Sequence, residues 1–516
     1  MQHILSRRAF ILASGALLSL SVLEQKALAA ANGGYFSLGV ASGSPRPNQV
    51  VLWTRLAPDP LNGGGMANEP AEVRVRVALD ANMSNIIIDD IVLARPAEAH
   101  SVHFVARGLE PGREYWYRFA YSGDESPIGR TRTSDPNASE AKIALAYCQH
   151  YEAGFYAAYR DLAEWMPDCV IHTGDYIYEG GTGTLGAQMR AVGGGERRLF
   201  ETVRVHNSAE ITTLWDYRNR HALYRTDPDL QAAHAVAPWI VALDDHEVDN
   251  NWAGNVPQDP EKQTQAEFMV RKLAALQAYY EHMPIEKPPV IDGLKARLQL
   301  FGAYRFGPAL VHMLDTRQFR SDQPCGDNRK PYCDEAFVAG STMLGKEQET
   351  WLKKSLRSSA APFNVMATQV WLTPYRYNAP PEAPIVNLDS WDGYPGARQD
   401  MLDMLASDVS NPVFLTGDWH TAMASTLHQD PFDIRSKRIG HELVGSSISS
   451  GCPWARDMEQ MRAANPHVHH LNGQQRGYLR TTFTSDICSA DFRVVDDVGR
   501  QDSPVRTDVS LRTKDL

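Results

Sequence analysis

Four short apolar runs of the sequence each end in side chains that could bind metal ions. The first run leads into residues 147–150 (Tyr-Cys-Gln-His) and the second into 174–179 (Gly-Asp-Tyr-Ile-Tyr-Glu). Two later runs lead into 244–247 (Asp-Asp-His-Glu) and 417–420 (Gly-Asp-Trp-His). One Asp or His at a strand end is more often a cap or a hydrogen-bonded polar group than a ligand. Four such ends favour a shared metal cluster, because carboxylates that converge without a cation repel one another.

The donor types narrow the choice of metal. A thiolate from Cys148 and a phenolate from Tyr178, together with carboxylates, suit Fe³⁺ better than zinc in a Cys/His cage. The abundant carboxylate and backbone oxygens suit Ca²⁺ as a second ion. Asp175 lies three residues before Tyr178, so it could bridge two ions while the tyrosine binds one. Two metals about 3.5–4 Å apart could hold a phosphate group and set up in-line attack on phosphorus.

These motifs lie where strands and helices are predicted to alternate. Thr264 and Glu267 form a capping-box pattern before a helix that Pro284 ends. Open α/β sheets place their sites at the carboxyl ends of strands, which is where the donors lie. We therefore expect an α/β (α+β) catalytic domain over residues 140–500, with buried strands at 143–147, 169–172, 239–243, 310–314, 365–367 and 413–415.

Residues 30–135 predict a small all-β domain. The stretch from Leu109 through Pro111 to Tyr115 is similar to the tyrosine corner of fibronectin-type sandwiches, in which the Tyr hydroxyl ties a crossover back to the backbone. Gly, Pro and Asn turns separate short branched runs, which predict strands at 50–55, 72–78, 86–93 and 102–106.

The first 29 residues predict a twin-arginine signal peptide. Arg7 and Arg8 precede the apolar run Phe10–Leu23, and Ala27-Leu28-Ala29 supplies a small-residue cleavage site. Such a signal addresses the twin-arginine export machinery, so we expect a periplasmic or secreted protein. No later run reaches the length of a membrane-spanning helix.

Charge and cysteines add further constraints. Lys and Arg total 51 against 62 Asp and Glu, and the net charge of −11 argues against a nucleic-acid-binding surface. A small anionic substrate stays possible, since bound metals reverse the local field. Cys325 and Cys333 flank a turn-rich loop and could close a disulfide, and Cys452 and Cys488 are possible partners. Residues 501–516 predict a frayed polar tail, and the glycines of 180–195 predict a mobile insertion near a cleft.

The ordered motifs Cys-x-His, Gly-Asp-x-x-Tyr, Asp-Asp-His-Glu and Gly-Asp-x-His resemble the metallophosphoesterase signature in the variant used by PhoD-type alkaline phosphatases. The resemblance implies an exported phosphomonoesterase and phosphodiesterase with iron and calcium. It also implies a small fibronectin-like N-terminal domain and a metallophosphoesterase-like sheet sandwich flanked by helices, with a purple-acid-phosphatase-like site. It extends beyond the donors to segments 38–43, 51–55, 206–210, 217–221 and 314–318.

The resemblance also implies roles for single residues. It places Asp175, Asp245 and His420 at calcium or bridging positions. His246 would contact phosphate or protonate the leaving oxygen. The candidates for the iron site are Cys148, Asp175, Tyr178 and Asp418.

Arg317 is a further catalytic candidate. It follows a buried run and could clamp phosphate with its forked guanidinium. An ion pair with Asp315 or another carboxylate is an equally open alternative.

Two alternatives to a phosphatase follow from the same sequence. One is a phospholipase D-type phosphodiesterase, whose substrate choice would lie in the insertion and in the C-terminal segments. The other is a secreted binding protein that uses the β-domain and has an inactive core. Intact Asp175, Asp245 and His420 argue against the second.

Overall fold

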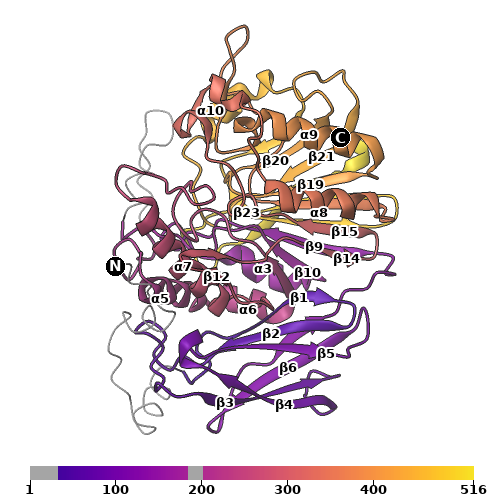
Figure 1. The fold of residues 1–516 in the computed structure, drawn as a ribbon. Coiled ribbons are helices and arrows are strands. Elements are labelled where there is room, and N and C mark those ends of the chain that lie inside the picture. Colours follow the sequence, from indigo (N-terminus) through magenta and orange to yellow (C-terminus); the bar gives the residue numbers. More distant parts are fainter. Residues whose placement is uncertain (1–32, 184–201) are drawn as a thin grey trace.

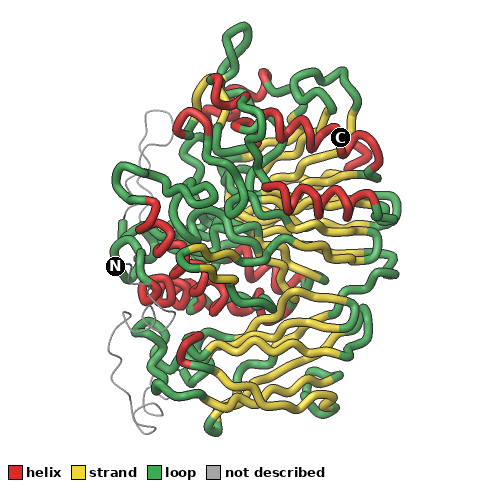
Figure 2. The backbone as a smooth tube through the Cα atoms, in the orientation of Figure 1, coloured by secondary structure: helices red, strands yellow, loops and turns green. Residues whose placement is uncertain are grey.

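The computed structural model describes residues 33–183 and 202–516 (Figure 1). The predicted signal peptide, residues 1–29, and the part of the predicted insertion from residue 184 on lie outside the described residues. Figure 2 shows that the longer helices gather in the part of the chain that follows the N-terminal region, whereas the N-terminal region itself is almost entirely strand and loop.

The largest sheet carries three of the four donor-bearing strands side by side. Its central strands β9, β10, β11 and β1 are parallel, with Val170 paired to Ala144 on one side and to Trp239 on the other. In order across the sheet, the nine strands are β25 (Val505–Arg512), β24 (Cys488–Val495), β23 (Arg476–Phe483), β9 (Ala141–Ala146), β10 (Cys169–His172), β11 (Pro238–Val241), β1 (Val40–Arg46), β2 (Gln49–Arg55) and β5 (Ser101–Arg107).

A second sheet carries the fourth donor-bearing strand, β19. Strands β15, β17, β19 and β21 run parallel at its centre. In order, its seven strands are β14 (Gly302–Phe306), β15 (Ala309–Met313), β17 (Phe363–Thr368), β19 (Pro412–Thr416), β21 (Arg438–Val444), β20 (Ala422–His428) and β22 (Val468–Asn472). Small two-stranded sheets join β12 (Val290–Asp292) to β13 (Lys295–Arg297) and β16 (Arg329–Pro331) to β18 (Ile385–Asn387).

The two large sheets pack face to face with helices on their outer sides. Along β9, Ile143 and Leu145 point into the core shared with Val365 and Leu415 of the second sheet. The alternate residues of β9 pack in the helix-side core, as the two-residue period of a strand requires. Helices α3 (Ala157–Trp165), α5 (Leu214–Arg225), α6 (Pro228–Val236) and α7 (Gln265–His282) contribute to that core, while α8 (Gly345–Arg357) and α9 (Pro395–Asp408) cover the second sheet.

Shorter helical segments lie in the connections. They are α10 (Ala455–Met461) and the 3₁₀ turns η1 (Pro96–Glu98), η2 (Pro324–Gly326), η3 (Asp334–Phe337), η4 (Trp391–Gly393), η5 (Arg462–Ala464) and η6 (Thr513–Asp515). Among the described helices, none has the length and apolar composition needed to cross a bilayer.

Helix α7 begins where the sequence predicts. The Thr264 side chain accepts from the Glu267 backbone N–H, and the Glu267 carboxylate accepts from the Thr264 backbone N–H. Each side chain satisfies a donor that the first helical turn leaves open. The predicted capping box is confirmed.

The N-terminal region is all-β, as predicted, and its first strands extend the catalytic sheet. Ser42 of β1 pairs with Pro238 of β11. The Tyr115 hydroxyl accepts from the Glu110 backbone N–H at 2.8 Å, which confirms the predicted tyrosine tie. The second N-terminal sheet comprises β4 (Ile86–Ala94), β3 (Ala71–Ala78), β6 (Glu114–Tyr121) and β7 (Asp124–Glu125), with β8 (Gly129–Arg132) paired to β6.

The predicted frayed tail is wrong for most of residues 501–516. Strand β25 pairs antiparallel with β24 at the edge of the nine-stranded sheet. Val509 and Leu511 alternate with polar residues and pack against the core between the sheets. The alternation is short and contains few apolar residues, so the polar composition of the segment did not indicate a strand.

The cysteines divide into one bridge and four thiols. Cys325 and Cys333 form the expected disulfide. Cys452 and Cys488, considered as possible partners, are buried free thiols.

Candidate metal centre

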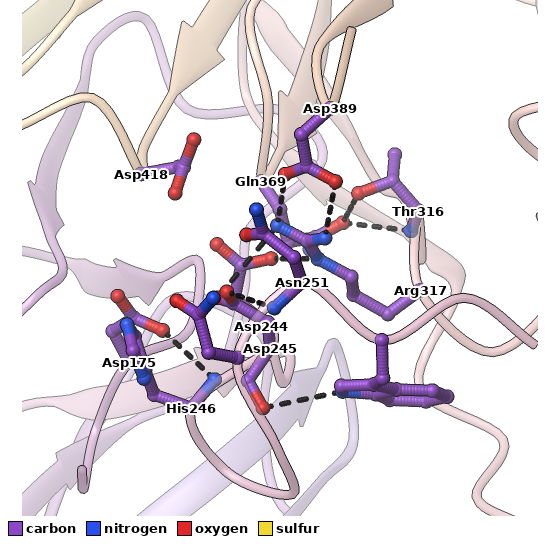
Figure 3. A network of polar contacts seen from close by, with 12 residues as sticks. Asp175, Asp244, Asp245, His246, Asn251, Thr316, Arg317, Gln369, Asp389 and Asp418 are labelled. Carbon is purple, nitrogen blue, oxygen red and sulfur yellow. Dashed lines mark hydrogen bonds and ion pairs between the residues drawn. The ribbon is translucent and has the colours of Figure 1, made fainter. Parts of the chain in front are cut away.

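The four donor-bearing strand ends meet at one edge of the paired sheets. Cys148 follows β9, Asp175 follows β10, Asp245 follows β11 and Asp418 follows β19. Because β9, β10 and β11 are parallel neighbours, their carboxyl ends share an edge. Figure 3 shows three of these carboxylates close together, with His246 beside them.

The backbone at these positions is unusual. Cys148, Asp175, Asp418 and His420 have φ values of 51°, 55°, 62° and 48°. The left-handed region is costly for residues with a Cβ and is tolerated mainly where function demands it. At Gly174, with φ 114°, an added Cβ would lie 2.3 Å from the Asp244 backbone nitrogen, so only glycine allows the two loops to approach this closely.

A thiol, a carboxyl, a phenol and an imidazole converge at one point. Cys148 Sγ lies 3.1 Å from Asp175 Oδ2, and the Tyr178 hydroxyl donates to the same oxygen at 2.9 Å. His420 Nε2 is 3.3 Å from the Tyr178 hydroxyl. Donor atoms of Cys148, Asp175 and His420 lie within 4.8 Å of one another. Cys148, Asp175 and Tyr178 lie together as the sequence predicts for one ion, but the fourth member of the group is His420 and not Asp418.

Neighbouring groups orient His420 as a ligand. Its Nδ1 donates to the Gly451 carbonyl at 2.6 Å, so the lone pair of the neutral ring resides on Nε2. Burial and the nearby Arg476 charge lower the pKa of His420 to about 3. The ring therefore stays neutral, as metal binding requires.

Four carboxylates form the acidic side of the site. Oxygens of Asp175, Asp244, Asp245 and Asp418 lie within 4.8 Å of one another. Burial and neighbouring carboxylates raise the pKa of Asp418 well above its usual range, and burial raises that of Asp244 to about 7. Burial also raises the pKa of Asp175 well above normal. Such carboxyls ionise fully only when a cation offsets their mutual repulsion.

Asp245 provides the observation that best tests whether cations fit. Burial opposes its ionisation, yet the positive charges of Arg317 and His246 outweigh this and lower its pKa. Its Oδ2 accepts from the Asn251 backbone at 2.8 Å, while its buried Oδ1 has no hydrogen-bond partner among the described residues. An ionised, buried oxygen of this kind is the donor that a hard cation requires. The residues present fit a cation site.

Glu247 has a structural role that sequence reasoning did not assign. Its two carboxylate oxygens accept backbone N–H bonds from Asp175 at 3.0 Å, Tyr176 at 2.6 Å and Asp244 at 2.7 Å. It therefore clamps the loops after β10 and β11 together. The sequence signal for this role is the position of Glu247 at the end of the motif 244–247, because a buried acid at that position needs hydrogen-bond partners.

Arg317 is not free to clamp phosphate. Its guanidinium is completely buried and binds both oxygens of Asp389 at 2.8 Å each (Figure 3). Its Nε donates to Asp244 at 2.5 Å, and Asp245 lies 3.6 Å away. The structure thus supports the ion-pair alternative, with Asp244 and Asp389 in place of Asp315. The sequence could not reveal Asp389 as a partner, because 72 residues separate the two.

His246 lies beside the cluster and is held by a carboxylate and a ring. Its Nδ1 lies 2.7 Å from Glu179 Oε2, and its ring stacks on Tyr178 with centroids 4.2 Å apart. Burial disfavours the charged ring, but Glu179, Asp245 and Asp175 outweigh it and raise the pKa of His246 well above normal. Glu179 thus engages Nδ1 and fixes the position of the ring.

A second cluster beside the metal centre has the composition of a metal site. Its members are occupied by contacts with one another and with Arg220. His150, Glu152 and His206 bring donor atoms within 4.8 Å of one another. Arg220 lies 3.1 Å from His206 Nδ1, and its positive charge disfavours a cation there. Glu152 accepts from the His206 backbone at 2.9 Å. His150, the histidine of the Cys-x-His motif, thus belongs to this neighbouring group.

Arg220 explains two segments of the resemblance that carry no metal donors. It donates to the Tyr178 and Gly180 carbonyls and to Ser208 Oγ, the last at 2.9 Å. Segments 206–210 and 217–221 therefore fix the backbone of the loop that presents Tyr178.

Comparisons with known proteins show the family of the chain. The family model described as PhoD-like phosphatase matches residues 143–492, and the model described as PhoD-like phosphatase, N-terminal domain, matches residues 23–135. Alkaline phosphatase D of Bacillus subtilis (strain 168) is 44% identical over 484 residues, which cover 92% of this chain and 80% of the relative.

A solved structure described as the structure of PhoD superposes with a TM-score of 0.86 at 43% identity, and the match covers 92% of this chain and 90% of that one. The mixed sheets and the all-β N-terminal region are thus shared with that structure. On the match of both family models and on this identity, the chain belongs to the PhoD-like phosphatase family.

Proposed function

We propose that this protein is an exported, metal-dependent phosphohydrolase that cleaves phosphate monoesters, phosphate diesters or both. The observation that carries the proposal is the convergence of four strand ends, which brings a thiol, a phenol, an imidazole and four carboxylates together. Family membership and the name of the Bacillus subtilis relative support the same class of reaction. The two facing sheets support a metallophosphoesterase-like core.

The geometry favours one refinement of the ligand assignment implied by the sequence. His420 lies with Cys148 and Tyr178, so we assign it to the Fe³⁺ side together with Asp175. Asp418 lies with the carboxylates, so we assign it with Asp245 to the Ca²⁺ side. Asp175 belongs to both groups and is the bridging candidate. When bound, the two metals would supply Lewis acidity toward the phosphoryl group and the attacking water.

The protein's own residues would carry the remaining work. His246, held through Nδ1 by Glu179, would donate a proton from Nε2 to the leaving oxygen. Glu247 and Arg220 would keep the ligand loops in place. Arg317 would hold Asp244 and orient it within the acidic cluster.

Turnover of three substrates would test the proposal. The exported, metal-replete protein should hydrolyse p-nitrophenyl phosphate, bis-p-nitrophenyl phosphate or both. Preference for phosphatidylcholine would favour the phospholipase D-type alternative, and no turnover of any of the three would favour an inactive binding protein.

N-terminal sequencing of the exported form tests the signal peptide. A start near Ala30 is expected, and an intact Met1 would contradict export through this route.

A further inference from the structure

A second buried group of polar side chains consists mainly of hydrogen-bond donors, whereas the metal centre consists mainly of carboxylates. Arg225, the last residue of α5, is fully buried where α5 meets the N-terminal strands. Its Nη2 donates to the His282 carbonyl at 2.8 Å. Its Nε and Nη1 have no hydrogen-bond partner among the described residues. Unsatisfied donors of a charged group are rare and costly in a protein core.

Neighbouring polar groups share this condition. His221 precedes Arg225 by four residues on α5, which places both on one face of the helix. Both ring nitrogens of His221 are buried without a partner, and its ring stacks on His282 with centroids 4.9 Å apart. The Tyr117 hydroxyl and Ser42 Oγ are also buried and lie close to each other, and neither has a hydrogen-bond partner on any other described residue. Burial raises the pKa of Tyr117, while Ser42 and Arg225 act in the opposite direction, so these groups lie in one another's electrostatic reach.

The charges at this junction do not balance. Arg225 packs over the Trp53 ring at 4.2 Å, and Arg55 is also fully buried, with one N–H group unpartnered. Within the described residues, neither guanidinium forms an ion pair. The nearby Glu281 is already bound by Arg218 at 2.5 and 2.6 Å.

The neighbouring histidine His221 does not change the charge of the junction. Burial lowers the pKa of His221 to about 3, so its ring is neutral. Burial lowers the pKa of Arg55 to about 10 and also lowers that of Arg225, so at neutral pH the junction holds two positive charges beside N–H and O–H groups. Stacking on Trp53 offsets part of the cost of burying Arg225. Water could accept some of the donors, but only an anion supplies both acceptors and the missing charge.

We propose that this junction binds a small monovalent anion, such as chloride, held by Arg225 with Tyr117, Ser42 and His221 around it. The anion would act as a structural counter-charge that fastens β1 and β6 to helix α5. The proposal is independent of the phosphohydrolase assignment, because none of these residues belongs to the metal centre.

Bromide substitution tests the site directly in the intact protein. Crystals grown or soaked in sodium bromide should show an anomalous difference peak within hydrogen-bond distance of Arg225 Nε or Nη1. A map with ordinary solvent density there and no anomalous signal would mean that water satisfies the donors, and the proposal would be overturned.

Thermal unfolding tests the predicted contribution to stability. Sodium chloride should raise Tm by about 2–4 °C over sodium gluconate at equal ionic strength, since an anion bound only by the folded state stabilises it. The Arg225→Met variant should lose this difference. The control Arg500→Met, at an exposed arginine paired with Asp502, should keep it.

Two results would overturn the proposal: equal Tm values for the wild type in the two salts, or a chloride effect retained by Arg225→Met. Should Arg225→Met fail to fold, the bromide map of the wild-type protein decides the question, and Tyr117→Phe should weaken the chloride effect without removing a charge.

Discussion

The metal centre and the α5 junction are two buried regions with opposite electrostatic character. The metal centre gathers carboxylates around Arg317, while the junction gathers guanidinium, hydroxyl and imidazole groups without a free carboxylate. Burial is costly for either kind of charge, so each region requires a partner of the opposite sign. A buried excess of acceptors indicates cations, and a buried excess of donors indicates an anion.

Helix α5 connects the two regions. Arg220 donates to the Tyr178 carbonyl on the side of the metal centre. His221 and Arg225 face the junction. One helix therefore positions a candidate metal ligand and also contributes the charge that lies between the N-terminal strands.

Replacing Asp175 should have the largest effect on activity, because it changes the acidic metal centre directly. Asp175→Asn removes the carboxylate that both ligand groups share, and we expect hydrolysis to fall by roughly 10³-fold or more. Metal content, measured by elemental analysis, should fall with it. The exposed control Asp502→Asn should retain both. Near-normal turnover by Asp175→Asn would refute the assignment of the site.

Removing Arg317 takes away the arginine that pairs with Asp244. Arg317→Met leaves Asp244 buried without its ion pair and leaves Asp389 with Arg320 alone, so the free energy of unfolding should fall by about 3–5 kcal/mol. Urea unfolding of the metal-free proteins measures this. A phosphate clamp would instead raise KM with little loss of stability, and that outcome would restore the clamp hypothesis.

Arg220 tests how strongly α5 controls the Tyr178 loop. Arg220→Lys keeps the charge but cannot reach all three acceptors, and we expect roughly 10–100-fold weaker metal retention. Dialysis against a chelator with timed metal analysis measures the loss. The same variant should retain the chloride effect on Tm, because the hydrogen bonds of Arg220 go to the Tyr178 loop and to segment 206–210 and not to the junction. Unchanged retention would show that the loop holds its shape without Arg220.

Asp161 provides a half-buried region where opposite charges pair directly. It binds Arg493 at 2.8 Å and Arg480 at 2.6 Å, joining α3 to β23 and β24. Burial raises its pKa, but these arginines and Tyr478 outweigh burial and lower the pKa below normal. The stabilisation is therefore present above the ordinary carboxyl pKa and is lost as pH falls through the lower folded value.

Asp161→Asn should cost about 1 kcal/mol at pH 7, and the gap to the wild type should narrow only as pH falls from about 4 through the lower folded pKa of Asp161. Urea unfolding at pH 7 and at a series of pH values below about 4 measures it. A gap that widens on acidification would contradict the sign of the shift.

The sequence predicted those features that depend on local pattern. The strand at 169–172 and the capping box at Thr264 follow from residue periodicity and spacing, and the donors sit at strand ends that parallel pairing must align. The Arg317–Asp389 pair and the α5 junction depend on segments that meet only in the folded chain. Strand β25 was missed because Val509 and Leu511 become buried only through packing against the core between the two sheets.

Anomalous scattering at the iron edge, recorded from crystals of protein purified without chelator, tests the central claim most directly. The account predicts a strong peak between Cys148 Sγ and Asp175 Oδ2, within bonding reach of the Tyr178 hydroxyl and His420 Nε2. A fully active preparation with no peak there, or with stoichiometric zinc as its sole metal, would contradict it.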